Sequence, residues 1–317
     1  MSRAKSYHCL TASLMALWLA APARAIEPNP VFFETFDGAG IHADYYEPKA
    51  APAGAPMVIL LHMYRSDRTA WKPLAGPLHD AGFAVLAIDM RGQGESVTPE
   101  LRRRVERRDP KVFEEVYQDI RAAYDWLAQQ EGIDRSRFAL VGASVGCSVS
   151  LRYAVQDRSV DAIVCLTPGL DYLGLDSRPD MKKIRGRAIL MLATEDEREA
   201  AKTLATMAEG ARGRIVASGK VHGTRMFGKV PGIEKEIVTF LREGVGEPTK
   251  TTVYGSINSN IWHPRESGWI AQISPSNMRH YSSAEEAEAR GLRKTRSMGP
   301  GDRPGKRKPE GTPDDDP

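Results

Sequence analysis

Apolar runs of strand length alternate with segments of helical periodicity along most of this 317-residue chain. Residues 57–61 and 84–88 are almost wholly apolar, which is typical of parallel strands buried on both faces. Residues 71–81 lie between them and are predicted to form a helix. Upstream, residues 31–36 and 41–46 favour an opening pair of antiparallel strands.

A longer amphipathic helix is predicted over residues 112–130, because its apolar side chains recur at helical spacing. These side chains are Val112, Val116, Ile120, Ala123 and Leu127. Alternation of strands and helices of this kind predicts an α/β fold with a doubly wound, mostly parallel sheet. The composition changes beyond Gly246, where we expect a small α+β appendage.

The most informative local motif is a serine placed between two glycines where a strand meets a helix. Residues 137–141 read as a buried strand and residues 145–155 as a helix, with Ser144 at the junction. This is the G-x-S-x-G pattern of a nucleophile elbow. We expect glycine at Gly142 and Gly146 because a side chain at either position would collide with the adjoining strand or helix.

Two further residues complete a candidate catalytic triad in the order Ser144, Asp196, His222. His222 would take the proton of Ser144 and later give it to the leaving group, and an acid would orient the imidazole. Asp196 follows an apolar strand run and is the favoured acid. Its neighbours Glu195 and Glu197 are the alternatives.

Acyl transfer also needs amide donors for an oxyanion. Position in the chain predicts the N–H of Val145, at the start of the helix, and the N–H of Met63, after the strand at 57–62. His62 is expected to have a structural role. The Met63 side chain either faces the substrate or packs on the core.

From about residue 31 to 244 the chain resembles the α/β-hydrolases, close to the dienelactone-hydrolase and esterase-like branch. The matching segments are 61–63, 87–96, the elbow at Ser144, 166–172, 193–196 and 221–224. At the oxyanion loop a glycine commonly follows the histidine in that family, whereas this chain has Met63. The resemblance implies a serine hydrolase that cleaves a carboxylic ester or related small acyl compound through an acyl-enzyme intermediate. The alternatives are a peptidase, a thioesterase or a noncatalytic scaffold that binds a ligand.

Composition excludes several other classes of function. The formal net charge of +3 is too small to imply a nucleic-acid partner. The seven histidines and three cysteines form no cluster with metal-ligand spacing, and the proposed chemistry requires no cofactor. Cys147 and Cys165 are expected to be free and buried, and a disulfide between them is the alternative. The segment 101–108 is rich in arginine and is expected to be a solvated loop or helix face; the alternative is attraction of an anionic substrate or membrane surface.

Residues 1–25 have the features of a secretory signal peptide. Arg3 and Lys5 precede the apolar stretch 10–20, and an A-x-A cleavage signal ends at Ala25. We therefore expect cleavage near Ala25, export to the periplasm or medium, and no stable membrane span in the mature chain. An uncleaved anchor is the alternative.

The mature chain divides into a hydrolase domain at 26–246, a linker at 247–250, a small module at 251–296 and a tail at 297–317 predicted to be disordered. Within the module, Ser283 and Glu286 predict a capping box that opens a helix ending at Gly291.

The module resembles the small metal-binding domain of the Ada repair protein. The matching positions are Gly255, Ser256, Asn258 to Asn260, His263, Trp269, Ser282 to Ala287 and Gly291 to Arg293. The family's metal-binding cysteines correspond to Ser267, Thr295 and Met298, so no zinc is expected. Because so small a module lacks a sufficient core without metal, we expect it to dock on the hydrolase domain or to be only marginally stable in isolation.

Overall fold

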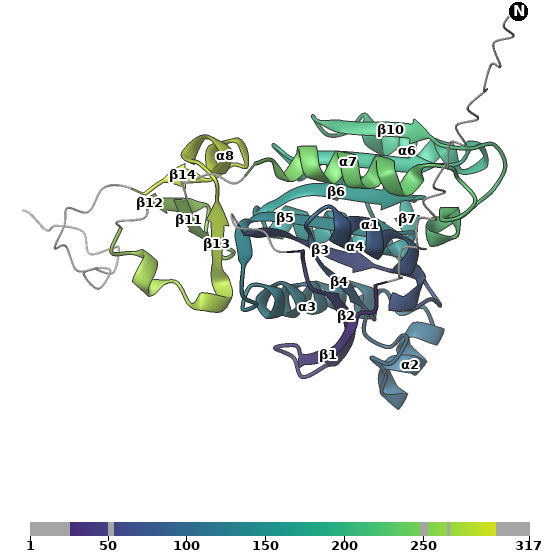
Figure 1. Ribbon diagram of the computed structural model, residues 1–317, viewed down its shortest axis with the longest axis horizontal. Helices are drawn as coiled ribbons and strands as arrows, with labels where there is room; N and C mark the ends of the chain where they lie inside the picture. The colour runs from purple at the N-terminus through teal and green to yellow at the C-terminus, as the bar shows by residue number, and fades with distance from the viewer. Residues whose placement is uncertain (1–25, 50–53, 248–252, 265–266, 296–317) are drawn as a thin grey trace, which may run out of the picture.

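The computed structural model describes residues 26–49, 54–247, 253–264 and 267–295 (Figure 1). Their main feature is an eight-stranded sheet in which β1 and β2 are antiparallel neighbours and the strands from β4 onward are parallel. In sheet order the strands are β1 (Asn29–Glu34), β2 (Gly40–Tyr46), β4 (Ala84–Ile88), β3 (Ala55–Leu61), β5 (Ile133–Ala143), β6 (Val160–Leu166), β9 (Ala188–Ala193) and β10 (Ala211–Ile215). The predicted fold class is confirmed.

The central strands are apolar at nearly every position because both faces of the sheet are covered. Every residue of β3, β4 and β6 is buried. Successive side chains point to opposite faces, so Ile59 and Leu61 join one core cluster while Val58 and Leu60 join the other. The two clusters fix the sheet between two helical layers.

The helices divide between the two faces. Helices α3 (Pro110–Leu127), α4 (Val145–Gln156), α5 (Arg178–Lys183) and α6 (Arg198–Ala205) contribute to the first cluster. Helices α1 (Lys72–Asp80) and α7 (Ile233–Val245) contribute to the second. The predicted helix at 112–130 corresponds to α3, which begins two residues earlier because the Asp109 carboxylate accepts a hydrogen bond from the N–H of Lys111 (3.0 Å).

The basic segment forms most of α2 (Pro99–Glu106), which contacts α3 and lies at one edge of the molecule (Figure 1). Arg102, Arg103 and Arg107 are exposed, whereas Arg104 pairs with Asp109 and Glu115. A largely solvated helix face was one of the two expected structures. The remaining short elements are the hairpin β7 (Asp171–Tyr172) and β8 (Leu175–Asp176) and the 3-10 turns η1 (Arg68–Trp71), η2 (Glu195–Glu197), η3 (Gly223–Met226), η4 (Ile270–Gln272) and η5 (Pro275–Asn277).

The C-terminal module is a second, four-stranded sheet with one helix. Its strands in sheet order are β13 (Met278–Tyr281), β11 (Val253–Ser256), β12 (Ile261–Pro264) and β14 (Arg293–Lys294), and its helix is α8 (Ala284–Ala289). The Ser283 hydroxyl accepts from the Glu286 N–H (3.1 Å), and the Glu286 carboxylate accepts from the N–H of Ser282 (2.6 Å). The predicted helix is therefore confirmed, with the second capping bond one residue earlier than expected.

The module packs against the amino ends of β5 and β6, as expected. Arg279 Nε donates to Asp157 Oδ2 over 2.6 Å, and both side chains are fully buried. The Arg279 guanidinium also lies 4.0 Å from the centre of the Tyr124 ring. A second buried ion pair joins Arg290 to Asp161. Figure 1 shows the module, in yellow, at the end of the sheet opposite to α2 and β7.

Some expectations concern residues outside the described ranges. These are the signal peptide at 1–25, most of the linker and the tail at 297–317. Among the described helices, none combines the length and the apolar character needed to cross a membrane.

Candidate active site

The predicted elbow is present at the junction of β5 and α4. Ser144 has φ 55° and ψ −118°, a backbone conformation that is unfavourable for a residue with a side chain. A Cβ atom on Gly142 would lie 2.2 Å from the carbonyl oxygen of Gly146. A Cβ atom on Gly146 would lie 2.2 Å from the carbonyl oxygen of Leu61, at the end of β3. Both glycines are therefore required for the close packing of this turn.

The structure pairs His222 with Glu197 rather than with Asp196. His222 Nδ1 lies 2.9 Å from Glu197 Oε1, and the Glu197 side chain is 15% exposed. Asp196 is exposed and has no hydrogen bond to the imidazole. The expected pairing is thus corrected. The pairing with Glu197 follows from the tight turn η2, in which successive side chains diverge by about 120°. Only one of the three neighbouring acids can therefore face the histidine.

Two threonines that the sequence analysis did not single out hold the loop that carries His222. Thr167 Oγ1 accepts from the Gly223 N–H over 2.9 Å, and Thr194 Oγ1 accepts from the Val221 N–H over 3.4 Å. Each threonine directly follows a strand, β6 or β9, at the carboxyl edge of the sheet. A polar residue at each of these strand ends was the available sequence signal.

Tyr172 brings the serine and the histidine together. Its ring packs edge-to-face on His222, with 6.1 Å between the centroids. The Tyr172 hydroxyl donates to the Thr167 carbonyl (3.2 Å), and the Ser144 side chain also interacts with Tyr172 and opposes the rise in its pKa. Burial, together with the negative charge of Glu197, raises the pKa of Tyr172, so the phenol stays neutral.

No hydrogen bond between Ser144 and His222 is formed within the described residues; the imidazole bonds to Glu197. The two nevertheless lie in adjacent segments: a Cβ atom on Gly223 would lie 3.4 Å from Cβ of Ala143. Bonds between nucleophile and base are often long before substrate binds.

The loop after β3 is held by His62, which has the structural role expected of it. His62 Nε2 accepts from the Met90 N–H (3.1 Å), so Nδ1 carries the proton and donates to the Met63 carbonyl (2.8 Å). Complete burial lowers the pKa of this imidazole and keeps it neutral. A Cβ atom on Gly223 would lie 3.0 Å from Met63 Sδ, which places Met63 beside the histidine loop.

Cys147 and Cys165 are free and buried, as expected. Cys147 Sγ donates to the carbonyl of Gly142 (3.2 Å), beneath the elbow. Burial raises the pKa of this thiol far above its usual value, so it packs as a neutral side chain.

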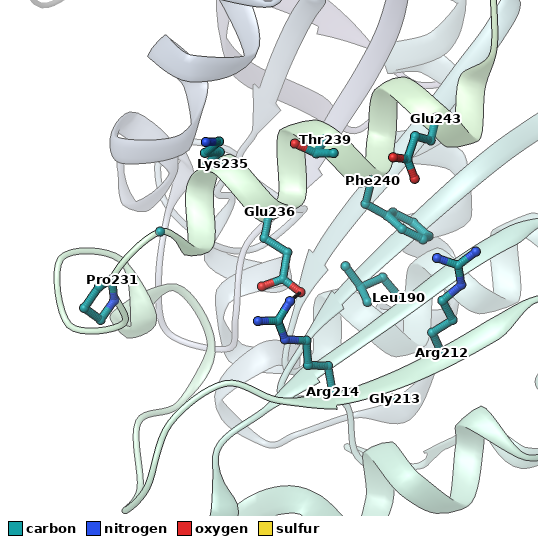
Figure 2. A pocket seen from close by; sticks show the side chains of 11 residues that line it. Leu190, Arg212, Gly213, Arg214, Pro231, Lys235, Glu236, Thr239, Phe240 and Glu243 are labelled. Carbon is teal, nitrogen blue, oxygen red and sulfur yellow. Dashed lines mark hydrogen bonds and ion pairs between the residues drawn. The ribbon is translucent and has the colours of Figure 1, made fainter.

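A cavity of about 620 Å³ lies between β10 and α7, away from these residues (Figure 2). Leu190 and Phe240 form its apolar part, and Arg214 Nη1 lies 2.6 Å from Glu236 Oε1. Neither Ser144 nor His222 lines it, so it is separate from the candidate active site.

The C-terminal module offers no obvious metal centre among the residues that the structure describes. His263 is buried and packs against the Trp269 ring, with 6.4 Å between centroids. No three His, Cys, Asp or Glu side chains of the described ranges are placed to hold a metal ion. Ser267 and Thr295 fall within those ranges and Met298 outside them.

Comparisons with solved structures decide the fold. An esterase of Pyrococcus furiosus matches with a TM-score of 0.55 at 18% identity, covering 69% of this chain and 92% of that one. This is the α/β-hydrolase fold. A family model described as serine aminopeptidase, S33, matches residues 53–203.

Two sequence relatives match different lengths of the chain. An uncharacterised protein of Mycobacterium tuberculosis is 32% identical over 139 residues, which are 44% of this chain and 44% of that protein. The match thus spans less than half the length of this curated relative. A thiohydrolase of Aspergillus aculeatus, aneE, is 26% identical over 241 residues, 74% of this chain and 70% of that protein. Together the family match and these neighbours support a hydrolase.

Proposed function

We propose that this protein is a serine hydrolase that cleaves a carboxylic ester through an acyl-enzyme intermediate. The observation that carries the proposal is the strained Ser144 at a glycine-flanked elbow beside a His222–Glu197 pair. We infer that Ser144 is the nucleophile, His222 the base and Glu197 the acid that orients it. Glu197 replaces Asp196 in this role because its carboxylate contacts the imidazole.

The chemistry follows from these positions. His222 Nε2 takes the proton of Ser144 as the serine oxygen bonds to the substrate carbonyl carbon. Collapse of the tetrahedral intermediate breaks the bond to the leaving alcohol, which receives the proton from His222. Water, deprotonated by the same imidazole, then releases the acid and regenerates Ser144. Glu197 holds the proton on Nδ1 and stabilises the imidazolium that forms twice in each cycle.

The oxyanion donors we propose are the N–H groups of Met63 and Val145. The close approach of the elbow to the end of β3, which Gly146 permits, supports this pair. The bond from His62 to the Met63 carbonyl restrains the same segment of backbone. Donors fixed before the reaction stabilise an oxyanion without reorganisation during the reaction.

A thioester is the second candidate substrate, because a fungal thiohydrolase is similar over 74% of this chain. The peptidase alternative has support from the description of the matching family model as a serine aminopeptidase. All three reactions use the same nucleophile and differ in the leaving group. We also propose that the protein is exported after cleavage near Ala25, because residues 1–25 have the composition of a signal peptide.

The test is labelling of the purified protein by a fluorophosphonate probe, which reacts with activated serines. We expect rapid labelling of the wild type and none of Ser144→Ala. Glu197→Gln should slow labelling and ester hydrolysis by about 10²- to 10⁴-fold, because the neutral amide no longer fixes the reactive tautomer. The matched control is Asp196→Asn, which should retain wild-type rates.

Two results would contradict the proposal. Absence of labelling in folded wild-type protein would favour the noncatalytic scaffold, whose ligand affinity Ser144→Ala would leave unchanged. A large loss in Asp196→Asn with none in Glu197→Gln would overturn the assignment of the acid.

A further inference from the structure

Tyr172 contacts both residues to which the catalytic proposal assigns proton transfer, yet that proposal gives it no chemical role. Its ring packs edge-to-face on His222, with 6.1 Å between the centroids. The Ser144 side chain interacts with it as well. A tyrosine hydroxyl is a hydrogen-bond donor, and a donor between nucleophile and base can act on the reacting atoms.

The segment that carries Tyr172 is braced on both sides. The ring lies against Gly169, where a Cβ atom would come within 2.5 Å of the ring carbon Cε2. The Tyr172 hydroxyl donates to the Thr167 carbonyl over 3.2 Å. After the hairpin β7–β8, the hydroxyl groups of Ser177 and Ser148, the latter on α4, are bonded over 2.9 Å, and both serines are buried. Rotation of the O–H bond alone can therefore redirect the hydrogen of Tyr172 to a new acceptor.

The phenol remains protonated and is held by a weak bond. Burial is the main cause that raises the pKa of Tyr172, and the negative charge of Glu197 acts in the same direction. The distance of 3.2 Å to the Thr167 carbonyl is long for a hydroxyl donor. An oxygen that carries developing negative charge is a stronger acceptor than a neutral carbonyl, so the hydroxyl gains by turning to it.

The order of the strands shows on which side of Ser144 this donor lies. One neighbour of β5 is β3, which Met63 follows, and the other neighbour is β6. Tyr172 follows β6, and the loop of His222 is held by threonines that follow β6 and β9. Tyr172 and His222 thus lie together on the side opposite to the Met63 N–H. Because the base that deprotonates the nucleophile later protonates the leaving group, the side of His222 is the side of the leaving group.

We propose that the Tyr172 hydroxyl donates a hydrogen bond to the oxygen of the leaving alcohol, so that the preferred substrates are oxygen esters of alkyl alcohols and not thioesters. The inference rests on the proposed serine hydrolase, because it names the substrate class of that site. As the tetrahedral intermediate collapses, the bond from the carbonyl carbon to the alcohol oxygen breaks and that oxygen takes the proton of His222 Nε2. Tyr172 keeps its own proton and stabilises the charge that builds on the oxygen during the transfer.

The contribution of this donor should depend on the leaving atom. An alkoxide oxygen concentrates its charge and accepts a hydrogen bond strongly. A 4-nitrophenolate spreads its charge over the ring, and sulfur is a weak acceptor. A hydrogen bond to a charged group changes a rate by about 10- to 100-fold. We therefore expect the Tyr172 hydroxyl to accelerate cleavage of alkyl esters much more than that of activated esters or thioesters.

The experiment compares three butyrates that differ only in the leaving group: ethyl butyrate, 4-nitrophenyl butyrate and S-ethyl thiobutyrate. Wild type should favour ethyl butyrate over the thioester in kcat/KM. Tyr172→Phe keeps the ring that packs on His222 and removes only the hydroxyl. It should lower kcat/KM for ethyl butyrate by about 10- to 100-fold and for the other two substrates by less than about threefold.

The matched control is Tyr124→Phe. It also removes a phenol that donates to a carbonyl, that of Arg135 over 3.3 Å, but at the amino end of β5, away from Ser144. This variant should leave the ratios among the three substrates unchanged. Fluorophosphonate labelling of Tyr172→Phe reports whether that variant is folded with a reactive Ser144.

The outcomes separate this inference from the catalytic proposal. If Ser144 is labelled, an equal loss on all three substrates in Tyr172→Phe would make the role of the hydroxyl structural, and no loss on any of them would remove it from the reaction. Either result would overturn this inference alone, as would a preference of wild type for the thioester. Absence of labelling in folded wild-type protein would overturn the hydrolase proposal itself.

Discussion

The ion pair between Arg279 and Asp157 offers the sharpest test of how the C-terminal module is held. Both side chains are fully buried, and Arg279 also covers the Tyr124 ring. Replacing Arg279 by methionine keeps most of the side-chain volume but removes the positive charge. Asp157 then remains as a buried carboxylate without its counter-ion.

The expected loss can be worked from the remaining contacts of Asp157. Breaking a buried ion pair from one side costs about 3–5 kcal/mol. Here Asp157 keeps hydrogen bonds from the Ser159 N–H (3.0 Å), the Ser159 hydroxyl (2.6 Å) and the Tyr153 hydroxyl (2.7 Å). Because these three donors still solvate the carboxylate, we place Arg279→Met at the lower end, about 3 kcal/mol. In a domain of this size that lowers the unfolding midpoint by about 6–12 °C.

The assay is thermal and urea unfolding of wild type, Arg279→Met, Asp157→Asn and the double variant. The double variant should be more stable than the sum of the single losses predicts, because the second substitution removes the charge that the first leaves unpaired. Arg293→Met, at an exposed arginine of the same module, is the control and should change little. A loss below 1 kcal/mol in Arg279→Met, or strict additivity in the double variant, would refute the reasoning.

Three further outcomes are expected. Gly146→Ala would bring a Cβ atom to 2.2 Å from the Leu61 carbonyl oxygen, so it should displace the oxyanion loop and slow fluorophosphonate labelling by about 10²- to 10³-fold; labelling at the wild-type rate would contradict this. Thr167→Val leaves the buried Gly223 N–H unpaired and should cost about 1–3 kcal/mol in unfolding free energy, which Thr167→Ser should restore. Burial opposes ionisation of Asp157, but Arg279 and the hydrogen bonds outweigh it and lower the pKa of this carboxyl in wild type, whereas burial without Arg279 should raise it in Arg279→Met. The stability advantage of wild type over Arg279→Met should therefore be complete above the raised pKa of the variant and shrink as pH falls toward the lowered pKa of wild type; a pH-independent difference would contradict this.

The fold could be predicted because its signals are local and repeated. The strands β3, β4 and β6 are apolar at nearly every position, and this is specific to a sheet covered on both faces. The elbow at Ser144 could also be predicted, because the turn requires glycine at positions 142 and 146 within one short segment. Such features depend on residues that are close in the chain, so they can be predicted from the sequence alone.

The acid of the site could not be chosen in the same way. Glu195, Asp196 and Glu197 are consecutive, and a difference of one residue in a tight turn decides which carboxylate faces His222. Tyr172 was missed for a related reason: its contact with Ser144 joins segments 28 residues apart, through a hairpin too short to have a periodic pattern. Side-chain direction and long-range contact are properties of the folded chain.

The separation of Arg279 and Arg290 along the chain from the carboxylates that they face has a consequence for how the protein folds. Asp157 and Asp161 lie in the middle of the sequence, yet the cations that face them are made more than a hundred residues later. Chains fold from the N-terminus as they are synthesised. Until the segment that carries Arg279 and Arg290 has been synthesised, Asp157 and Asp161 at the amino end of the large sheet lack their counter-ions. A chain that ended before Arg279 would carry its defect beside Asp157 and Asp161, at the end of the sheet away from Ser144 and His222.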